Sequence, residues 1–214
     1  MHADVQIAAG RVALPGDLDV PERARGVVVF AHGTGSSRLS PRNRAVAEHL
    51  RSSGAFGTLL FDLLTPDEDL TYGNRFDIEL LADRLVSASE ALGEVPRVGE
   101  LPIGYFGAST GAAAAIRAAV ALPARVEAVV SRGGRPDLAG EALAHLRAPT
   151  LLVVGGDDTQ VIALNRSAFA QIPAAEKALE IVPGATHLFE EPGALDEVAR
   201  LTLAWFERYL AVPA

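Results

Sequence analysis

The sequence predicts an α/β fold in which a mostly parallel central sheet is flanked by helices. Short, continuous apolar runs, typical of strands buried on both faces of a sheet, alternate along the chain with longer segments of helical periodicity. Two strand-like runs around Ala9-Gly10 precede this alternation and predict an antiparallel hairpin at the N-terminus. Because strands that alternate with helices form a parallel sheet, ligands are expected beyond the carboxyl ends of the strands.

The expected elements follow in chain order. The hairpin uses residues 5–7 and 11–14, and Pro15-Gly16-Asp17 ends its second strand. Buried strands are expected at 26–31, 57–61, 103–106, 126–130, 149–154 and 179–182. A helix begins at Ser40-Pro41, where serine is a suitable cap and proline fits the first turn. Further helices are expected at 78–92, 112–121, up to about Leu146, 161–171 and 195–209.

Apolar spacing assigns the faces of three helices that should pack on the sheet. These faces carry Val46, His49 and Leu50; Ile78, Leu81, Leu85, Ala88 and Leu92; and Leu195, Val198, Leu201, Thr202, Trp205 and Tyr209. The polar stretch from Thr65 to Gly73 is expected to be an exposed loop, with its Asp67-Glu-Asp69 run as a solvated face. No connection exceeds about a dozen residues, so no lid domain is expected.

Composition narrows the class of protein. The 214 residues have the length of a single domain, expected over 1–214, and 49% apolar with 21% charged residues is ordinary for a soluble globular protein. No signal peptide is visible and no apolar run reaches the roughly 20 residues that span a bilayer, so a cytoplasmic location and no membrane partner are expected. Without cysteine, disulfides and thiolate nucleophiles are excluded. A net charge of −8 disfavours nucleic acid.

A serine in a glycine-rich turn is the centre of the predicted site. Gly107-Ala-Ser109-Thr-Gly111 lies between a buried strand and an alanine-rich helix, which is the strand–turn–helix context of a G-x-S-x-G nucleophile elbow. The two glycines leave room where a Cβ would crowd the neighbouring strand or helix. The helix N-terminus directs free N–H groups at the position of an oxyanion, so Ser109 is the expected nucleophile and the Thr110 N–H an oxyanion donor.

A serine hydroxyl attacks a carbonyl at neutral pH only if a base takes its proton. In proteins with such an elbow, the acid and then the histidine come later in the chain, each at the end of a successive strand. Two histidines lie downstream of Ser109. His187 follows the last strand in a Pro-Gly-Ala-Thr loop and is the expected base, whereas His145 lies within a short helix, where a surface or packing role is expected.

The acid should follow the strand at 149–154. Asp157 and Asp158 both lie there, and Asp158 is favoured because it comes three residues after the first of the two glycines. Asp157 remains the alternative, and Asp137, which also resembles a helix cap, is a third candidate.

Two other loops are expected at the same edge of the sheet. His32-Gly-Thr34-Gly-Ser-Ser follows a strand, so the Thr34 N–H is the expected second oxyanion donor, with His32 as a buttress of the loop. Arg132 and Arg135 lie in a glycine-rich loop on the expected rim, and one of them is a candidate to bind a substrate carboxylate through its planar fork. A solvated loop arginine, or a pair with Asp137, explains them equally well.

These motifs together resemble the α/β-hydrolase superfamily. Within it, the chain is similar over nearly its whole length to the small lidless dienelactone-hydrolase-like proteins, some of which are fused to phosphoribosyltransferase domains. The resemblance rests on His-Gly-x-Gly-x-Ser, Gly-Ala-Ser-Thr-Gly, Gly-Gly-Asp-Asp and Gly-Ala-Thr-His, with Phe61-Asp-Leu-Leu-Thr and the segment 129–137 also matching. It implies Ser109 as nucleophile, Asp158 as acid and His187 as base. One departure is that dienelactone hydrolases use a cysteine nucleophile, so a serine esterase is the better description here.

The sequence therefore predicts a serine hydrolase that cleaves small carboxylic esters, lactones included, through a Ser-His-Asp triad. The expected partner is a small-molecule ester; no cofactor and no metal are expected, and the sequence gives no oligomeric state. The alternatives are a thioesterase, amidase or acyltransferase that uses the same triad, or a binding protein that keeps the fold without turnover. The lack of a lid predicts an open cleft that favours short or medium acyl chains.

Overall fold

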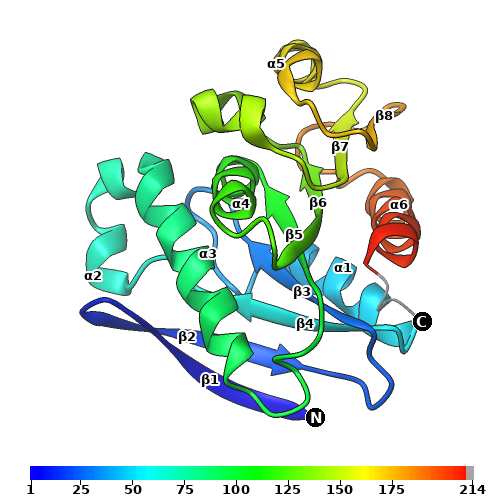
Figure 1. Cartoon of the computed structure of the whole chain (residues 1–214). Coiled ribbons are helices and arrows are strands. Elements are labelled where there is room, and N and C mark those ends of the chain that lie inside the picture. The colour runs from blue at the N-terminus through cyan, green and yellow to red at the C-terminus, as the bar shows by residue number, and fades with distance from the viewer. Residues whose placement is uncertain (211–214) are drawn as a thin grey trace.

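The computed structural model describes residues 1–210, in which eight strands form one central sheet (Figure 1). The strand order is β1-β2-β4-β3-β5-β6-β7-β8. The strands are β1 (His2–Ala9), β2 (Val12–Asp19), β3 (Gly26–Ala31), β4 (Phe56–Phe61), β5 (Ile103–Ala108), β6 (Val126–Arg132), β7 (Thr150–Gly155) and β8 (Lys177–Val182). Only the β1–β2 and β2–β4 pairs are antiparallel, so the predicted parallel sheet with an N-terminal hairpin is confirmed.

Helices cover both faces of the sheet. They are α1 (Pro41–Ser52), α2 (Pro66–Asp69), the 3₁₀ helix η1 (Tyr72–Phe76), α3 (Ile78–Gly93), α4 (Thr110–Ala121), the 3₁₀ segment η2 (Pro136–His145), α5 (Thr159–Gln171) and α6 (Ala194–Tyr209). Apolar side chains of α3, α4, η2 and α5 share one core cluster, and those of α1 and α6 share the other (Figure 1). None of the helices within residues 1–210 has the length and apolar character needed to cross a bilayer.

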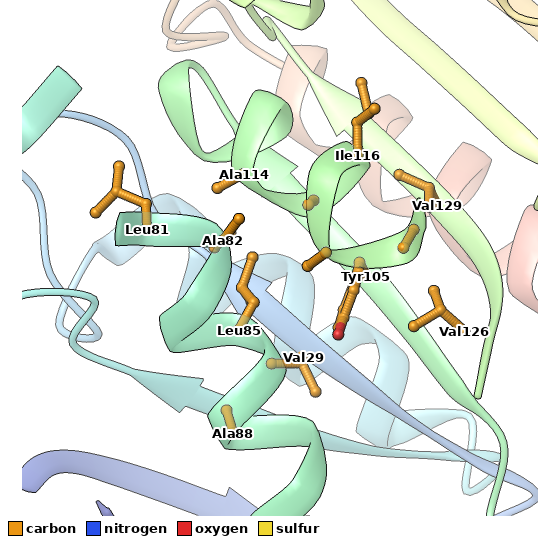
Figure 2. Packing of buried hydrophobic residues seen from close by; sticks show 14 of the residues in the cluster. Val29, Leu81, Ala82, Leu85, Ala88, Tyr105, Ala114, Ile116, Val126 and Val129 are labelled. Atoms are coloured by element: carbon orange, nitrogen blue, oxygen red, sulfur yellow. The ribbon is translucent and has the colours of Figure 1, made fainter. Parts of the chain in front are cut away.

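The larger core lies between the sheet and the pair α3 and α4. The predicted α3 stripe is buried along its whole length, and Figure 2 shows Leu85 on the side of α3 that faces the alanine-rich helix α4 and the strands behind it. Small alanine side chains on α4 let the two helices lie close together. The Tyr105 hydroxyl, which is fully buried, lies 2.6 Å from the Ser89 hydroxyl on α3, so the one polar group of this ring has a partner.

On the opposite face, α1 and α6 bury a smaller core of aromatic and aliphatic side chains. The Phe30 and Phe106 rings of neighbouring strands lie 4.9 Å apart between centroids, and Phe206 of α6 is fully buried. The prediction for α1 was wrong at His49, which is exposed, because the inner face turns through Ala47 instead.

Two predicted loops contain regular structure. The strand β2 continues past Pro15 to Asp19. The Pro15 carbonyl accepts a hydrogen bond from the Asp62 N–H, which lies just beyond the end of β4. Because the pairing of β2 with β4 begins only at Gly16, the N–H that Pro15 lacks is not needed for that ladder. Within the predicted loop 65–73, the short helix α2 begins with a capping box. Thr65 Oγ1 accepts from the Glu68 N–H and the Glu68 carboxylate accepts from the Thr65 N–H.

Candidate active site

Ser109 lies at a sharp turn between β5 and α4. Its backbone has φ 51° and ψ −122°, a positive φ that a residue with a side chain rarely adopts. A Cβ on Gly107 would lie 2.5 Å from the Ala112 Cα, and one on Gly111 would lie 2.2 Å from the Ala31 carbonyl oxygen. The turn therefore needs glycine on both sides of the serine, and its geometry is that of the predicted elbow.

His187 and Asp158 meet at the carboxyl ends of β7 and β8. The distance between His187 Nδ1 and Asp158 Oδ2 is 2.6 Å, whereas Asp157 is exposed. Because a carboxylate can only accept, Nδ1 donates, and this hydrogen bond leaves Nε2 of the neutral ring as an acceptor. Of the candidate acids, the structure thus brings Asp158, and not Asp157 or Asp137, to the histidine.

The loops that carry this pair are joined by backbone hydrogen bonds. The Gly156 N–H donates to the Val182 carbonyl at 2.8 Å, and the Asp157 N–H donates to the Ala185 carbonyl at 3.0 Å. A Cβ on Gly155 would lie 2.4 Å from the Ala185 oxygen, so glycine is required for the loops to approach this closely. Packing of the two loops fixes the separation of the acid from the histidine.

Ser109 and His187 line one cavity of about 210 Å³ at this edge of the sheet. Its other walls come from the loop after β3, the first turn of α1 and the end of β6. No hydrogen bond joins Ser109 Oγ and His187 within residues 1–210, and such catalytic contacts commonly tighten only when substrate binds. The nucleophile and base expected from the sequence therefore share one accessible space.

The two expected oxyanion donors lie side by side, but they are not equally free. The Thr110 N–H is in the first turn of α4, where no intrahelical partner exists. The Thr34 N–H instead donates to Thr110 Oγ1 at 3.0 Å. The Thr34 hydroxyl lies 3.0 Å from that of Thr110 and donates to the Arg75 carbonyl at 3.3 Å. The sequence could not reveal this chain of hydrogen bonds, because it depends on a side chain 76 positions away.

His32 holds the loop that contains Thr34. The Leu63 N–H donates to its Nε2 at 3.0 Å, so Nδ1 carries the proton of the neutral ring and donates to the Gly33 carbonyl at 3.0 Å. Burial lowers the pKa of His32, which favours this neutral form. The structure places His32 in the buttressing position expected from the sequence.

The two arginines that the sequence singled out have different environments. Arg135 binds the Asp137 carboxylate through two hydrogen bonds of 2.9 and 2.8 Å and does not line the cavity. Arg132 belongs to β6, not to the predicted loop, and is only 6% exposed, and it lines the cavity beside Ser109. Burial and the charge of Arg42 lower the pKa of Arg132 to about 10, so its guanidinium is charged at neutral pH.

Sequence reasoning missed Arg42, which also lines the cavity. Its position in the first turn of α1, directly after the loop 32–37, is the signal that could have identified it. Among the residues described, Arg42 and Arg132 are the cations of the cavity wall, and no carboxylate lines it.

Comparison with known proteins assigns the family. Residues 14–210 match the model of the dienelactone hydrolase family. A solved structure of a dienelactone hydrolase from Anabaena variabilis is 53% identical, with a TM-score of 0.94 and 98% of each chain covered. Est1E from Butyrivibrio proteoclasticus shares the fold at 16% identity and a TM-score of 0.80, with 96% of this chain and 98% of that one covered.

The curated relatives are longer proteins. Two Mycobacterium tuberculosis proteins, each named "Putative phosphoribosyl transferase", are 58% identical over 210 residues, which is 98% of this chain and 47% of theirs. The chain thus spans about half the length of the relatives it matches. With its eight-stranded sheet, its elbow and a family match over residues 14–210, the chain belongs to the dienelactone hydrolase family of α/β hydrolases.

Proposed function

We propose that the protein hydrolyses small carboxylic esters through an acyl-enzyme formed on Ser109. The observation that carries the proposal is the 2.6 Å hydrogen bond between His187 and Asp158, with His187 and Ser109 on the wall of one cavity. This arrangement gives a serine hydroxyl a base with a defined tautomer, which is what attack on a carbonyl at neutral pH requires.

The reaction follows from the positions of these groups. His187 Nε2 takes the proton of Ser109 Oγ as the oxygen attacks the ester carbonyl. The resulting oxyanion accepts a hydrogen bond from the Thr110 N–H. The protonated histidine then gives its proton to the leaving alkoxide. Water enters and attacks the acyl carbon as His187 takes one of its protons. His187 then returns that proton to Ser109 Oγ as the bond to the acyl group breaks and the acid leaves. Asp158 remains ionised throughout and stabilises the imidazolium.

The size of the cavity supports a small substrate. About 210 Å³ is below the range of roughly 300–1,000 Å³ typical of sites for drug-sized ligands. Short acyl and alcohol groups are therefore favoured over long lipids. The transferase name of the mycobacterial relatives belongs to proteins of which this chain covers only 47%.

Hydrolysis of p-nitrophenyl acetate and butyrate by the wild type and Ser109→Ala tests the proposal. The expected result is loss of all but background turnover in Ser109→Ala, with labelling of the wild type alone by a fluorophosphonate. Ser131→Ala is the matched control, because this buried serine is the last residue but one of the neighbouring strand β6 and its hydroxyl has no hydrogen-bond partner within residues 1–210. Equal rates in wild type and Ser109→Ala, with no label on either, would support the non-catalytic alternative.

A further inference from the structure

One wall of the cavity carries a positive charge that the protein does not neutralise. Within residues 1–210, the Arg132 guanidinium makes no hydrogen bond and no ion pair, and its buried Nε has no partner. Burial of an unpaired charge is costly, so buried arginines are normally matched with a carboxylate. Arg135, three residues later, shows the usual solution in its pair with Asp137.

A second cation faces the same space. Arg42 lines the cavity, and its effect on the pKa of Arg132 places the two guanidiniums within electrostatic reach of each other. Arg42 Nη1 binds Glu190 at 2.7 Å, but the Glu190 side chain is 62% exposed, so water screens much of its charge. The buried Nε of Arg42 has no partner among the described residues. Two cations therefore line the cavity, and one solvent-exposed carboxylate pairs with Arg42.

The first turn of α1 adds to this positive wall. This helix has 12 residues and begins at the cap Ser40, and Ser40, Arg42 and Asn43 all line the cavity. The dipole of such a helix attracts anions to its N-terminus. Pro41 has no N–H and the Asn43 N–H donates to Ser40 Oγ, so among the described residues the Arg42 N–H is the free backbone donor of this turn. The Ser36 hydroxyl, also on the wall, is a further donor.

The position of Arg132 is fixed by packing. Its guanidinium lies 5.9 Å from the ring centroid of Phe189, a fully buried residue with a positive φ of 57°. Stacking on an aromatic face orients the planar group without using its N–H donors. The donors therefore stay available to a ligand.

We propose that Arg132, Arg42 and the first turn of α1 form a subsite for a doubly charged, phosphate-sized oxyanion carried by the substrate. This rests on the proposed function for the position of the ester, which would lie at Ser109 on the same cavity. A dianion matches two adjacent cations better than a single carboxylate does. The donors also come from a strand, a helix N-terminus and a loop, which suits the several oxygens of a tetrahedral group.

Titration calorimetry with inorganic phosphate and with acetate at pH 8 tests this subsite without any hydrolysis. The wild type is expected to bind phosphate at least about tenfold more tightly than acetate. Arg132→Gln should weaken phosphate binding by at least about tenfold, and Arg42→Gln by several-fold. Arg135→Gln is the matched control and should change it by less than about twofold, since that arginine is paired elsewhere.

Three results would overturn the proposal: no measurable phosphate binding to the wild type, equal affinity for acetate, or unchanged phosphate binding in Arg132→Gln. If Arg132→Gln fails to fold, Arg132→Lys and Arg42→Gln replace it, and wild-type affinity in both would contradict the subsite. Ser109→Ala should bind phosphate as the wild type does. A wild type that binds phosphate but hydrolyses no ester would contradict the proposed function alone, and a wild type that hydrolyses esters but binds no phosphate would contradict this subsite alone.

Discussion

The Thr34 N–H donates to the Thr110 hydroxyl at 3.0 Å, so a backbone donor expected to face the oxyanion is directed at a side chain. Thr110→Val removes that hydroxyl and keeps the shape of the side chain. We expect a loss of about 1 kcal/mol in the free energy of unfolding, because the Thr34 N–H loses its partner, with no loss of kcat, because this N–H becomes free to face the cavity.

Urea unfolding and steady-state kinetics on one p-nitrophenyl ester measure both effects. Thr110→Ser keeps the hydroxyl and should behave as the wild type does. A fall in kcat of tenfold or more in Thr110→Val alone would contradict this view and give the hydroxyl a direct part in the reaction.

The two neighbouring aspartates offer a matched pair of variants. Asp158→Asn is expected to lower kcat by about 10³–10⁴-fold, because an amide at this position favours the wrong tautomer of His187. Asp157→Asn should leave kcat within about twofold, since Asp157 is exposed and makes no contact with the histidine. Kinetics of both variants beside the wild type decide the assignment, and the reverse order of effects would make Asp157 the acid.

The buried ring of His32 predicts a pH dependence of stability. Burial lowers the pKa of His32 in the folded protein below the ordinary value of 6.5 that applies to the unfolded chain. The folded state thus favours the neutral ring, and this contribution is complete above pH 6.5 and is lost as the pH falls below it towards the folded pKa.

Melting temperatures of the wild type and His32→Gln between pH 5 and pH 8 measure this contribution. The variant should be less stable at pH 8, where the Leu63 N–H and the Gly33 carbonyl lose a good partner. The gap between the two proteins should narrow towards pH 5. A constant gap over the whole range would show that His32 does not titrate on unfolding.

The elbow predicts a steric cost at one glycine. Gly111→Ala would place a Cβ 2.2 Å from the Ala31 oxygen and 2.6 Å from the His32 oxygen, both backbone atoms. We expect a loss of about 1–3 kcal/mol in unfolding free energy together with a large fall in kcat. Gly73→Ala is the control, because nothing lies within 4 Å of its added Cβ. Equal stability of the two variants in urea would contradict the packing described for the turn.

The fold and the main features of the site could be predicted because they depend on local patterns. The strand at 26–31 was predicted with the bounds of β3, and the α3 stripe was buried as expected, since continuous apolar runs and helical spacing report burial directly. The elbow carries its own signature, because its glycines are required by contacts within a few residues and with the adjacent strand. The capping box of α2 also depends on neighbouring residues only, and the spacing of Thr65 and Glu68 in the sequence could have predicted it.

The remaining features depend on contacts between distant segments. The position of Arg42 at the start of α1 places it near the active-site edge of the sheet, but the sequence does not show that it shares a cavity with Arg132, which lies 90 positions later. The separate environments of Arg132 and Arg135 likewise follow from where β6 ends, and the sequence prediction ended that strand two residues early. Side-chain partners of this kind are set by tertiary packing, which propensity and periodicity do not contain.

The sheet places the proposed acid and the proposed base after strands of unequal protection. Asp158 follows β7, which is buried throughout, whereas His187 follows β8, an edge strand that is mostly half-buried and pairs only with β7. An edge strand can detach while the rest of the sheet stays folded. The proposed hydrolase activity should therefore be lost at a lower denaturant concentration than the helical circular dichroism signal. Local unfolding of this one edge of the sheet would then inactivate the protein before the domain as a whole unfolds.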